Sequence, residues 1–151
     1  MDTIQTLPTR GQLERQLSQT LISLYRQQFG HLPKKITCYL FADKLAIVAE
    51  DTITSVEKIL FQNGKPDLAR SIRQEVSAAF TAKVKEVVTD ILEVEVADII
   101  IDSAVDTGYL GMIVFLNSEP QTRKPKRDIS RHKIEKSSAV LAASQLFSVD
   151  G

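Results

Sequence analysis

The chain has 151 residues, of which 43% are hydrophobic and 25% are charged, and its formal net charge is zero. These values fit a single soluble globular domain with a sizeable core. The sequence has no run of eighteen apolar residues, so no transmembrane helix is expected. The N-terminus lacks a basic region followed by an apolar stretch, and the only cysteine is Cys38. We therefore expect a cytoplasmic protein in a reducing compartment.

The first predicted element is a helix over about Gln12–Phe29. Thr9 followed by Gln12 has the spacing of a capping box, in which each side chain bonds a backbone N–H of the first turn. Gly30 and Pro33 end the helix. One face carries an apolar stripe at three- and four-residue spacing, formed by Leu13, Leu17, Leu21, Leu24 and Tyr25.

A hairpin of two strands, Lys35–Phe41 and Leu45–Glu50, is predicted next, with a turn at 42–44. The alternation of the first strand places Ile36, Cys38 and Leu40 on one face and Thr37, Tyr39 and Phe41 on the other. Both faces carry apolar groups, so we expect both to be at least partly covered.

A short helix should follow Thr54, because Glu57 lies three residues later and completes a second capping box. Asn63-Gly64 ends this helix. We expect its inner face to be apolar and to consist of Val56, Ile59, Leu60 and Phe61.

The longest predicted helix runs over about Pro66–Leu92 and would span roughly 40 Å. That length exceeds what a small four-stranded sheet can cover. We therefore hypothesise a homo-oligomer in which part of the apolar stripe of this helix meets a second chain. A monomeric mass in light scattering at micromolar concentration would contradict this hypothesis.

Two closing strands are predicted at Val94–Ser103 and Tyr109–Leu116, with Asp106-Thr107-Gly108 in the turn. The element order α-β-β-α-α-β-β indicates an α+β fold. In it, two antiparallel β-hairpins form a small sheet packed with three helices, and the helices cover one face. This domain takes up residues 1–117.

Residues 118–151 differ in character, with seven basic and four acidic residues, so this tail carries a charge of +3 and the body −3. We expect a flexible basic tail that could bind nucleic acid, an anionic lipid surface or an acidic protein. Within it, Ala139–Phe147 is a short amphipathic segment, too short to be a stable helix alone in water. It could dock on a partner or back on the body.

The residue types that most often carry chemistry are scattered through this chain. Cys38 lies among apolar neighbours, which indicates a buried structural thiol. The only other histidine is His132, in the tail, so metal binding by His31 is not favoured. No spacing supports a nucleophile pair of Cys38 and His31. Glycine-rich phosphate-binding motifs are absent, and Gly64-Lys65 is a helix stop.

Two charged groups could form ligand sites. Asp98, Asp102 and Asp106 are spaced by four residues and could hold a divalent cation, but a solvated strand face with a turn aspartate explains them too. Arg70 and Arg73, with Glu75 and Lys83 nearby, could bind an anion, but we interpret them as surface ion pairs. We therefore assign no catalytic, cofactor-binding or metal-binding residue.

The stretch from about Gly11 to Leu116 resembles a family of small bacterial proteins named for MpsC, a component of a Na+-translocating membrane-potential-generating system. Three segments carry the resemblance: LYRQQFGHLPKKITCYLFADKLAIVAED, ITSVEKILFQNGKPDLARSIRQEV and DTGYLGMIVFL. The family pattern of a threonine, a glutamate and a glycine stop is matched by Thr54, Glu57 and Gly64, and its Thr-Gly by Thr107-Gly108. Where the family reads close to GRGP, this chain has Gly30 and Pro33 without the arginine, which leaves any anion-binding role of that loop unsupported.

The resemblance implies an association with cation transport or inorganic-carbon uptake machinery, peripheral to the membrane through a partner. Our leading interpretation is a non-enzymatic accessory or regulatory subunit that acts through protein–protein contacts. One alternative is a nucleic-acid-associated protein that uses its basic tail. Another is a small enzyme or ligand sensor with a site at a dimer interface.

Overall fold

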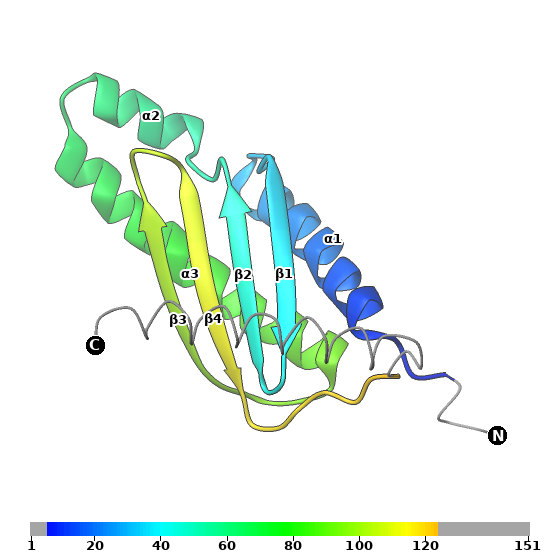
Figure 1. Ribbon diagram of the computed structural model, residues 1–151. Helices are drawn as coiled ribbons and strands as arrows, with labels where there is room; N and C mark the ends of the chain where they lie inside the picture. Colours follow the sequence, from blue (N-terminus) through cyan, green and yellow to red (C-terminus); the bar gives the residue numbers. More distant parts are fainter. Residues whose placement is uncertain (1–5, 124–151) are drawn as a thin grey trace, which may run out of the picture.

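A computed structural model describes residues 6–123, and residues 1–5 and 124–151 lie outside the described part. The predicted tail beyond Arg123, including Ala139–Phe147 and His132, falls outside it. The described part confirms the predicted order of three helices and four strands (Figure 1). These elements are α1 (Arg10–Phe29), β1 (Lys35–Phe41), β2 (Lys44–Glu50), α2 (Ser55–Gln62), α3 (Pro66–Leu92), β3 (Val96–Ala104) and β4 (Tyr109–Leu116).

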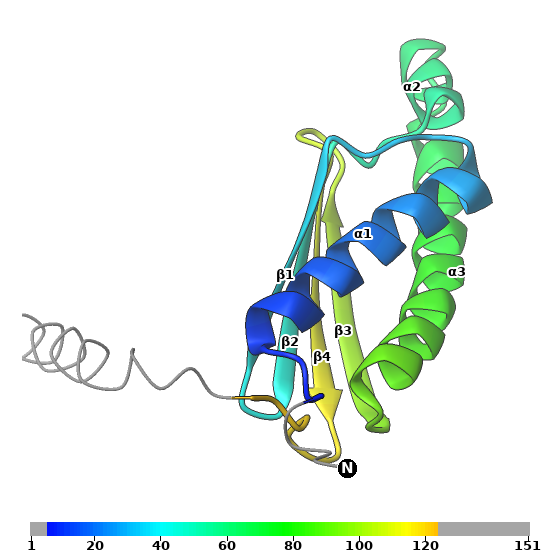
Figure 2. The ribbon, with the colours of Figure 1, turned by 90° about the vertical axis from the view of Figure 1, so that its right-hand side faces the viewer.

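The four strands form one antiparallel sheet in the order β1-β2-β4-β3. The two predicted hairpins are therefore joined through their second strands, with Ile47 of β2 opposite Met112 of β4. Figure 2 shows α1 and α3 on the same side of the sheet, while no described element covers the other side. The prediction that helices cover one face is confirmed. The expectation that both faces of the first hairpin are at least partly covered was wrong for residues 6–123, because Tyr39, Phe41 and Val48 on the opposite face are exposed there.

The core lies between the sheet and these two helices. Alternation along each strand sends every second side chain into it, as the buried positions Ile36, Cys38 and Leu40 of β1 show. The helices contribute the predicted stripe of α1 and the buried face of α3. Their fully buried members are Leu17, Leu21, Tyr25, Ala69, Phe80, Val84 and Val88.

Local signals set the beginnings of the first two helices as predicted. The capping boxes of Thr9 with Gln12 and of Thr54 with Glu57 are both present. Gly30 ends α1 in the left-handed conformation, with φ of 65°.

Helix α2 lies beside the first turns of α3, where α3 extends past the strand ends (Figure 1). The extra length of α3 is thus covered by α2 of the same chain, which removes the reason for expecting a second chain there. Homo-oligomerisation through the long helix stays a prediction.

The predicted inner face of α2 was wrong. Val56 and Ile59 are more than half exposed, Leu60 and Phe61 are only partly buried, and the buried residue of this helix is Glu57. An eight-residue helix has room for one inward face, and here that face carries a charge.

Candidate functional site

Within residues 6–123, a group of polar side chains converges on an ion pair between α2 and α3. Arg73 Nε donates to Glu57 Oε1 at 2.6 Å, and Arg73 Nη2 donates to Glu57 Oε2 at 2.7 Å. Glu57 is 1% exposed and Arg73 is 5% exposed. The Arg73 guanidinium therefore binds the Glu57 carboxylate in a buried bidentate geometry, with two parallel hydrogen bonds, which is the strongest geometry for such a pair.

Thr54 adds further bonds to the same carboxylate. Its backbone N–H and its hydroxyl both donate to Glu57 Oε2, at 2.8 and 2.7 Å. Burial by itself raises the pKa of Glu57, but the hydrogen bonds from Arg73 and Thr54 outweigh burial, so the pKa of Glu57 is lowered. The carboxylate is thus held as an anion, and its oxygens are engaged by donors.

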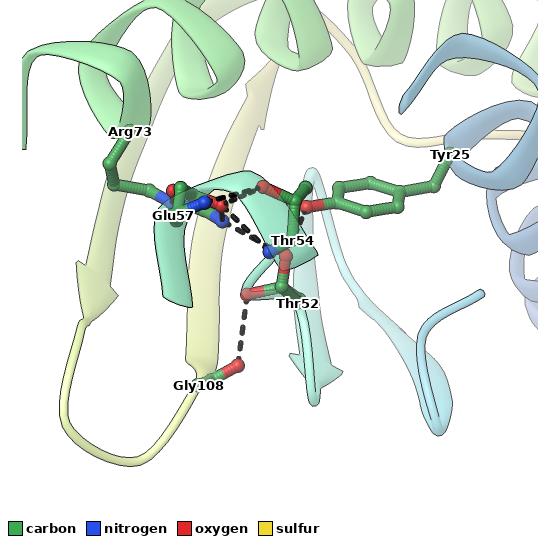
Figure 3. Close-up of polar contacts among 6 residues, drawn as sticks. All are labelled: Tyr25, Thr52, Thr54, Glu57, Arg73 and Gly108. Atoms are coloured by element: carbon green, nitrogen blue, oxygen red, sulfur yellow. Dashed lines mark hydrogen bonds and ion pairs between the residues drawn. The ribbon is translucent and has the colours of Figure 1, made fainter. Parts of the chain in front are cut away.

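Thr52 connects this pair to the rest of the fold (Figure 3). Its carbonyl oxygen accepts from Tyr25 Oη at 2.6 Å and from Arg73 Nη2 at 2.9 Å. Its backbone N–H and its hydroxyl both donate to the Gly108 carbonyl, at 3.0 and 2.9 Å. The network therefore ties α1, α2, α3 and the β3–β4 turn to the segment that leaves β2.

Gly108 is positioned for this role by its backbone. Its φ is +79°, a conformation that L residues other than glycine rarely adopt. A Cβ at Gly108 would lie 3.5 Å from Asp51 Cα and 3.6 Å from Ile53 Cγ1, which is ordinary contact. The conformation, rather than the space, requires glycine.

The chemistry of this cluster favours a structural role. We name it the buried clamp and define it by Tyr25, Thr52, Thr54, Glu57, Arg73 and Gly108. Burial raises the pKa of the Tyr25 hydroxyl, so it remains a donor. Burial alone lowers the pKa of Arg73, but its bond to Glu57 outweighs this effect, the pKa is raised, and the guanidinium stays charged. A carboxylate gripped by a permanent cation is a poor general base.

The arginines considered as an anion site are separated in the structure. Arg73 points into the network, whereas Arg70 is exposed and pairs with Asp67 at 3.0 Å. The surface interpretation was therefore right for Arg70 and wrong for Arg73. Lys83 is paired with Glu86 at 3.4 Å on the surface.

One sequence signal could have identified Arg73 as buried. It lies four residues after Ala69 and seven before Phe80, both fully buried. A charged residue in the register of an apolar stripe faces the core and needs a partner there.

Cys38 and His31 have structural surroundings. Cys38 is buried as predicted, and burial raises its pKa to about 11. His31 Nε2 donates to the Asp51 carbonyl at 2.7 Å, which braces the loop after α1. A structural role therefore accounts for both side chains.

The aspartate row lies on the outer side of β3 and its turn. Asp98 and Asp102 accept from the backbone N–H of the following residue, Ile99 and Ser103, at 2.9 and 2.8 Å. Asp106 lies in the turn. Within residues 6–123, no three residues of the His, Cys, Asp and Glu types group as metal ligands would.

These aspartates protect an edge of the sheet. The Leu116 N–H donates to the Asp43 carbonyl on the β2 side, so alternation turns the amides of Phe115, Ile113 and Gly111 toward β3. The N–H groups of Ile99, Ile101 and Ser103 on β3 then face outward. The Asp98 and Asp102 carboxylates accept from the amides of Ile99 and Ser103, which disfavours the addition of a further strand at this edge.

The other edge is protected in the same way. By the same alternation, the Leu40 N–H of β1 faces outward, and it donates to Glu14 Oε2 of α1 at 2.7 Å. Each edge strand thus has at least one outward amide that an acidic side chain engages.

The uncovered face of the sheet exposes several large apolar side chains. Tyr39, Phe41, Val48, Ile100 and Tyr109 are between 38% and 59% exposed. The rings of Tyr39 and Phe41 stack at 5.7 Å, and the Arg10 guanidinium lies 5.4 Å from the centre of the Tyr39 ring. We name this surface the open face and define it by the outward residues Lys35, Thr37, Tyr39, Phe41, Lys44, Ala46, Val48, Glu50, Asp98, Ile100, Asp102, Ala104, Tyr109, Gly111, Ile113 and Phe115.

A groove of about 490 Å³ lies at the end of the molecule where α3 finishes. Its walls include Leu7, Pro8, Ile91, Leu92, Val94 and Glu119. Its walls combine apolar and acidic groups.

Comparison with protein families matches residues 9–118 to the family described as "Na+-translocating membrane potential-generating system (MpsC)". The chain belongs to the MpsC family. The matched range holds all seven elements and both features described above, the buried clamp and the open face. No curated protein and no solved structure matches the chain. Within residues 6–123, the helices are too short or too polar to cross a membrane.

Proposed function

We propose that this MpsC-family protein is a non-catalytic accessory subunit of a membrane-potential-generating system, and that it binds a protein partner through the open face. The observation that carries the proposal is the open face itself. Aromatic residues and arginine, the types that most often anchor protein interfaces, gather there, as Tyr39, Phe41 and Arg10 show.

The edges of the sheet favour contact through its face. A partner that added a strand would need free amides, but Glu14, Asp98 and Asp102 accept from amides on both outer strands. A partner that packs flat on the apolar side chains meets no such obstacle. These edge contacts support the proposal that association occurs through the face.

The charges on this side favour a protein over a nucleic acid. Arg10 and Lys44 are offset by Asp98 and Asp102, so the surface is electrostatically mixed. A polyanion would meet no continuous basic track. The predicted binding of nucleic acid by the basic tail concerns residues that, beyond Arg123, lie outside the described part, and it stays a prediction.

Site-specific photo-crosslinking in the native cell tests the proposal. A benzophenone amino acid at Val48 places the probe on the open face, and the same probe at Gln74 on the exposed side of α3 is the matched control. We expect an adduct from Val48, but not from Gln74, that mass spectrometry identifies as a subunit of cation-translocating machinery. Ile100→Ser should lower its yield at least fivefold. The same adducts from both positions, or none from Val48, would refute the proposal.

A further inference from the structure

We propose that the open face is covered by the chain's own segment Ala139–Phe147 when the partner is not bound. This inference rests on the proposed function, because the partner and the segment would compete for the same surface. It goes beyond that function because it assigns a segment of the same chain as a competitor for the partner's binding surface.

The size of the open face calls for an occupant. Four strands spaced by about 4.8 Å, with some six residues of about 3.4 Å each, present roughly 400 Å² in projection. The largest apolar patch on a typical monomer is about 300–600 Å² and is often functional. Tyr39, Val48 and Ile100 are exposed on this surface, and few polar side chains lie between them.

The described chain ends beside this surface. The Arg123 N–H donates to the Pro8 carbonyl at 2.8 Å, which fixes the last described residue against the segment before α1. Figure 2 shows the described C-terminal stretch passing under the sheet and emerging on the side away from α1 and α3, near the β1–β2 turn. The residues after Arg123 therefore start beside the end of the sheet that carries the β1–β2 turn.

The number of connecting residues gives a suitable reach. Residues 124–138 number fifteen, and a random coil of that length would have a root-mean-square span of about 20 Å. The open face extends about 14 Å from β1 to β3, which is three strand spacings. A tether that matches its span gives an effective concentration in the millimolar range, so even a weakly binding segment would occupy the face.

The segment and its connection complement the face in chemistry. Ala139–Phe147 carries Val140, Leu141, Leu146 and Phe147 and no charged residue. The connection 124–138 has six basic and two acidic residues, and the far side of the face carries Asp98 and Asp102. Apolar side chains can thus pack on the centre of the face while the basic connection runs past its acidic edge.

Paramagnetic broadening in the full-length protein tests this placement. A nitroxide is attached through Ser148→Cys, and the buried Cys38 with its raised pKa reacts slowly with the label. We expect the amide signals of Tyr39, Ala46 and Ile113 to lose at least half of their intensity, and those of Lys58 and Gln62 in α2 to keep theirs. Leu146→Ser with Phe147→Ser should restore the signals, whereas Ser144→Ala with Gln145→Ala should not.

Three results would overturn the inference: unchanged signals on the open face, broadening that survives Leu146→Ser with Phe147→Ser, and broadening carried between molecules. The last is measured by mixing ¹⁵N protein without label and labelled ¹⁴N protein, and it would assign the face to a second copy. The proposed function has a separate readout, since the adduct from Val48 can form whether or not the segment competes. If the inference holds, Leu146→Ser with Phe147→Ser should also raise that adduct yield.

Discussion

Arg73 Nε and Glu57 Oε1 lie 2.6 Å apart across sixteen residues of sequence, and both side chains are buried. Helix α2 is thus fastened to α3 and to the sheet by a charge pair at its centre. Its apolar residues Val56 and Ile59 remain exposed because the inward position is taken by Glu57. The attachment of α2 therefore depends on a polar bond network, which gives it a specific response to mutation and to pH.

Removing one partner of the Glu57–Arg73 pair should lower the free energy of unfolding. In Arg73→Met, the Glu57 carboxylate stays buried without its cation, and we expect the free energy of unfolding to fall by about 3–5 kcal/mol. Glu57→Leu combined with Arg73→Met removes both charges and should recover at least half of that loss. Urea denaturation of the four proteins of this cycle measures the coupling. Additive single and double losses would show that the pair contributes no coupling energy.

Acid should weaken the protein through Glu57. The pKa of Glu57 is lowered in the folded state, so its contribution to stability is fully present above the ordinary glutamate pKa of about 4.3 and is lost as the pH falls through the lowered folded value. Glu57→Gln removes this dependence. We expect the difference in unfolding free energy between wild type and Glu57→Gln to be constant from pH 7 to 5.5 and to shrink below pH 4.5. A difference that does not change down to pH 3 would contradict the lowered pKa.

Local sequence signals were sufficient for the elements and their order. The threonine caps, Gly30 and the alternation of β1 act over a few residues, and each keeps its meaning in the folded chain. The clamp could not be predicted in this way, because Glu57 and Arg73 meet only once the α2–α3 turn is formed. The apolar spacing of Val56 and Ile59 was misleading, since a helix of eight residues does not determine its inward face by periodicity alone.

Substitution of Gly108 should expose its conformational role. In Gly108→Ala, the added Cβ meets only ordinary contacts, so the positive φ determines the cost, and we expect about 1–2 kcal/mol of destabilisation. Gly111→Ala is the matched control, because its Cβ would meet nothing within 4 Å and it has no positive φ. Thermal or urea unfolding measures both variants. Equal effects at the two positions would rule out backbone conformation as the cause.

The thiol of Cys38 should be inert in the folded protein. With a pKa of about 11, its thiolate fraction at pH 8 is lower than that of an ordinary cysteine by about two orders of magnitude, before any shielding by burial. We expect reaction with an aromatic disulfide reagent to be at least 100-fold slower than for a Thr107→Cys, Cys38→Ala control, whose thiol is in an exposed turn. In 6 M guanidinium the two rates should converge. A Cys38 that reacts as fast as the control before unfolding would contradict its burial.

The edge bond of Glu14 should be visible in hydrogen exchange. The Leu40 N–H faces out of the sheet and is held only by this carboxylate, a charge-assisted bond of about 1.5–3 kcal/mol. In Glu14→Ala the amide faces solvent at the edge, and we expect Leu40 to exchange at least tenfold faster while the amide of Ile47, in the centre of the sheet, keeps its rate. Arg15→Ala, at the exposed neighbouring position, is the control and should leave both rates unchanged. If Leu40 keeps its protection in Glu14→Ala, another group must cover that edge. The β1 edge would then be available for strand addition, and association would not be restricted to the open face.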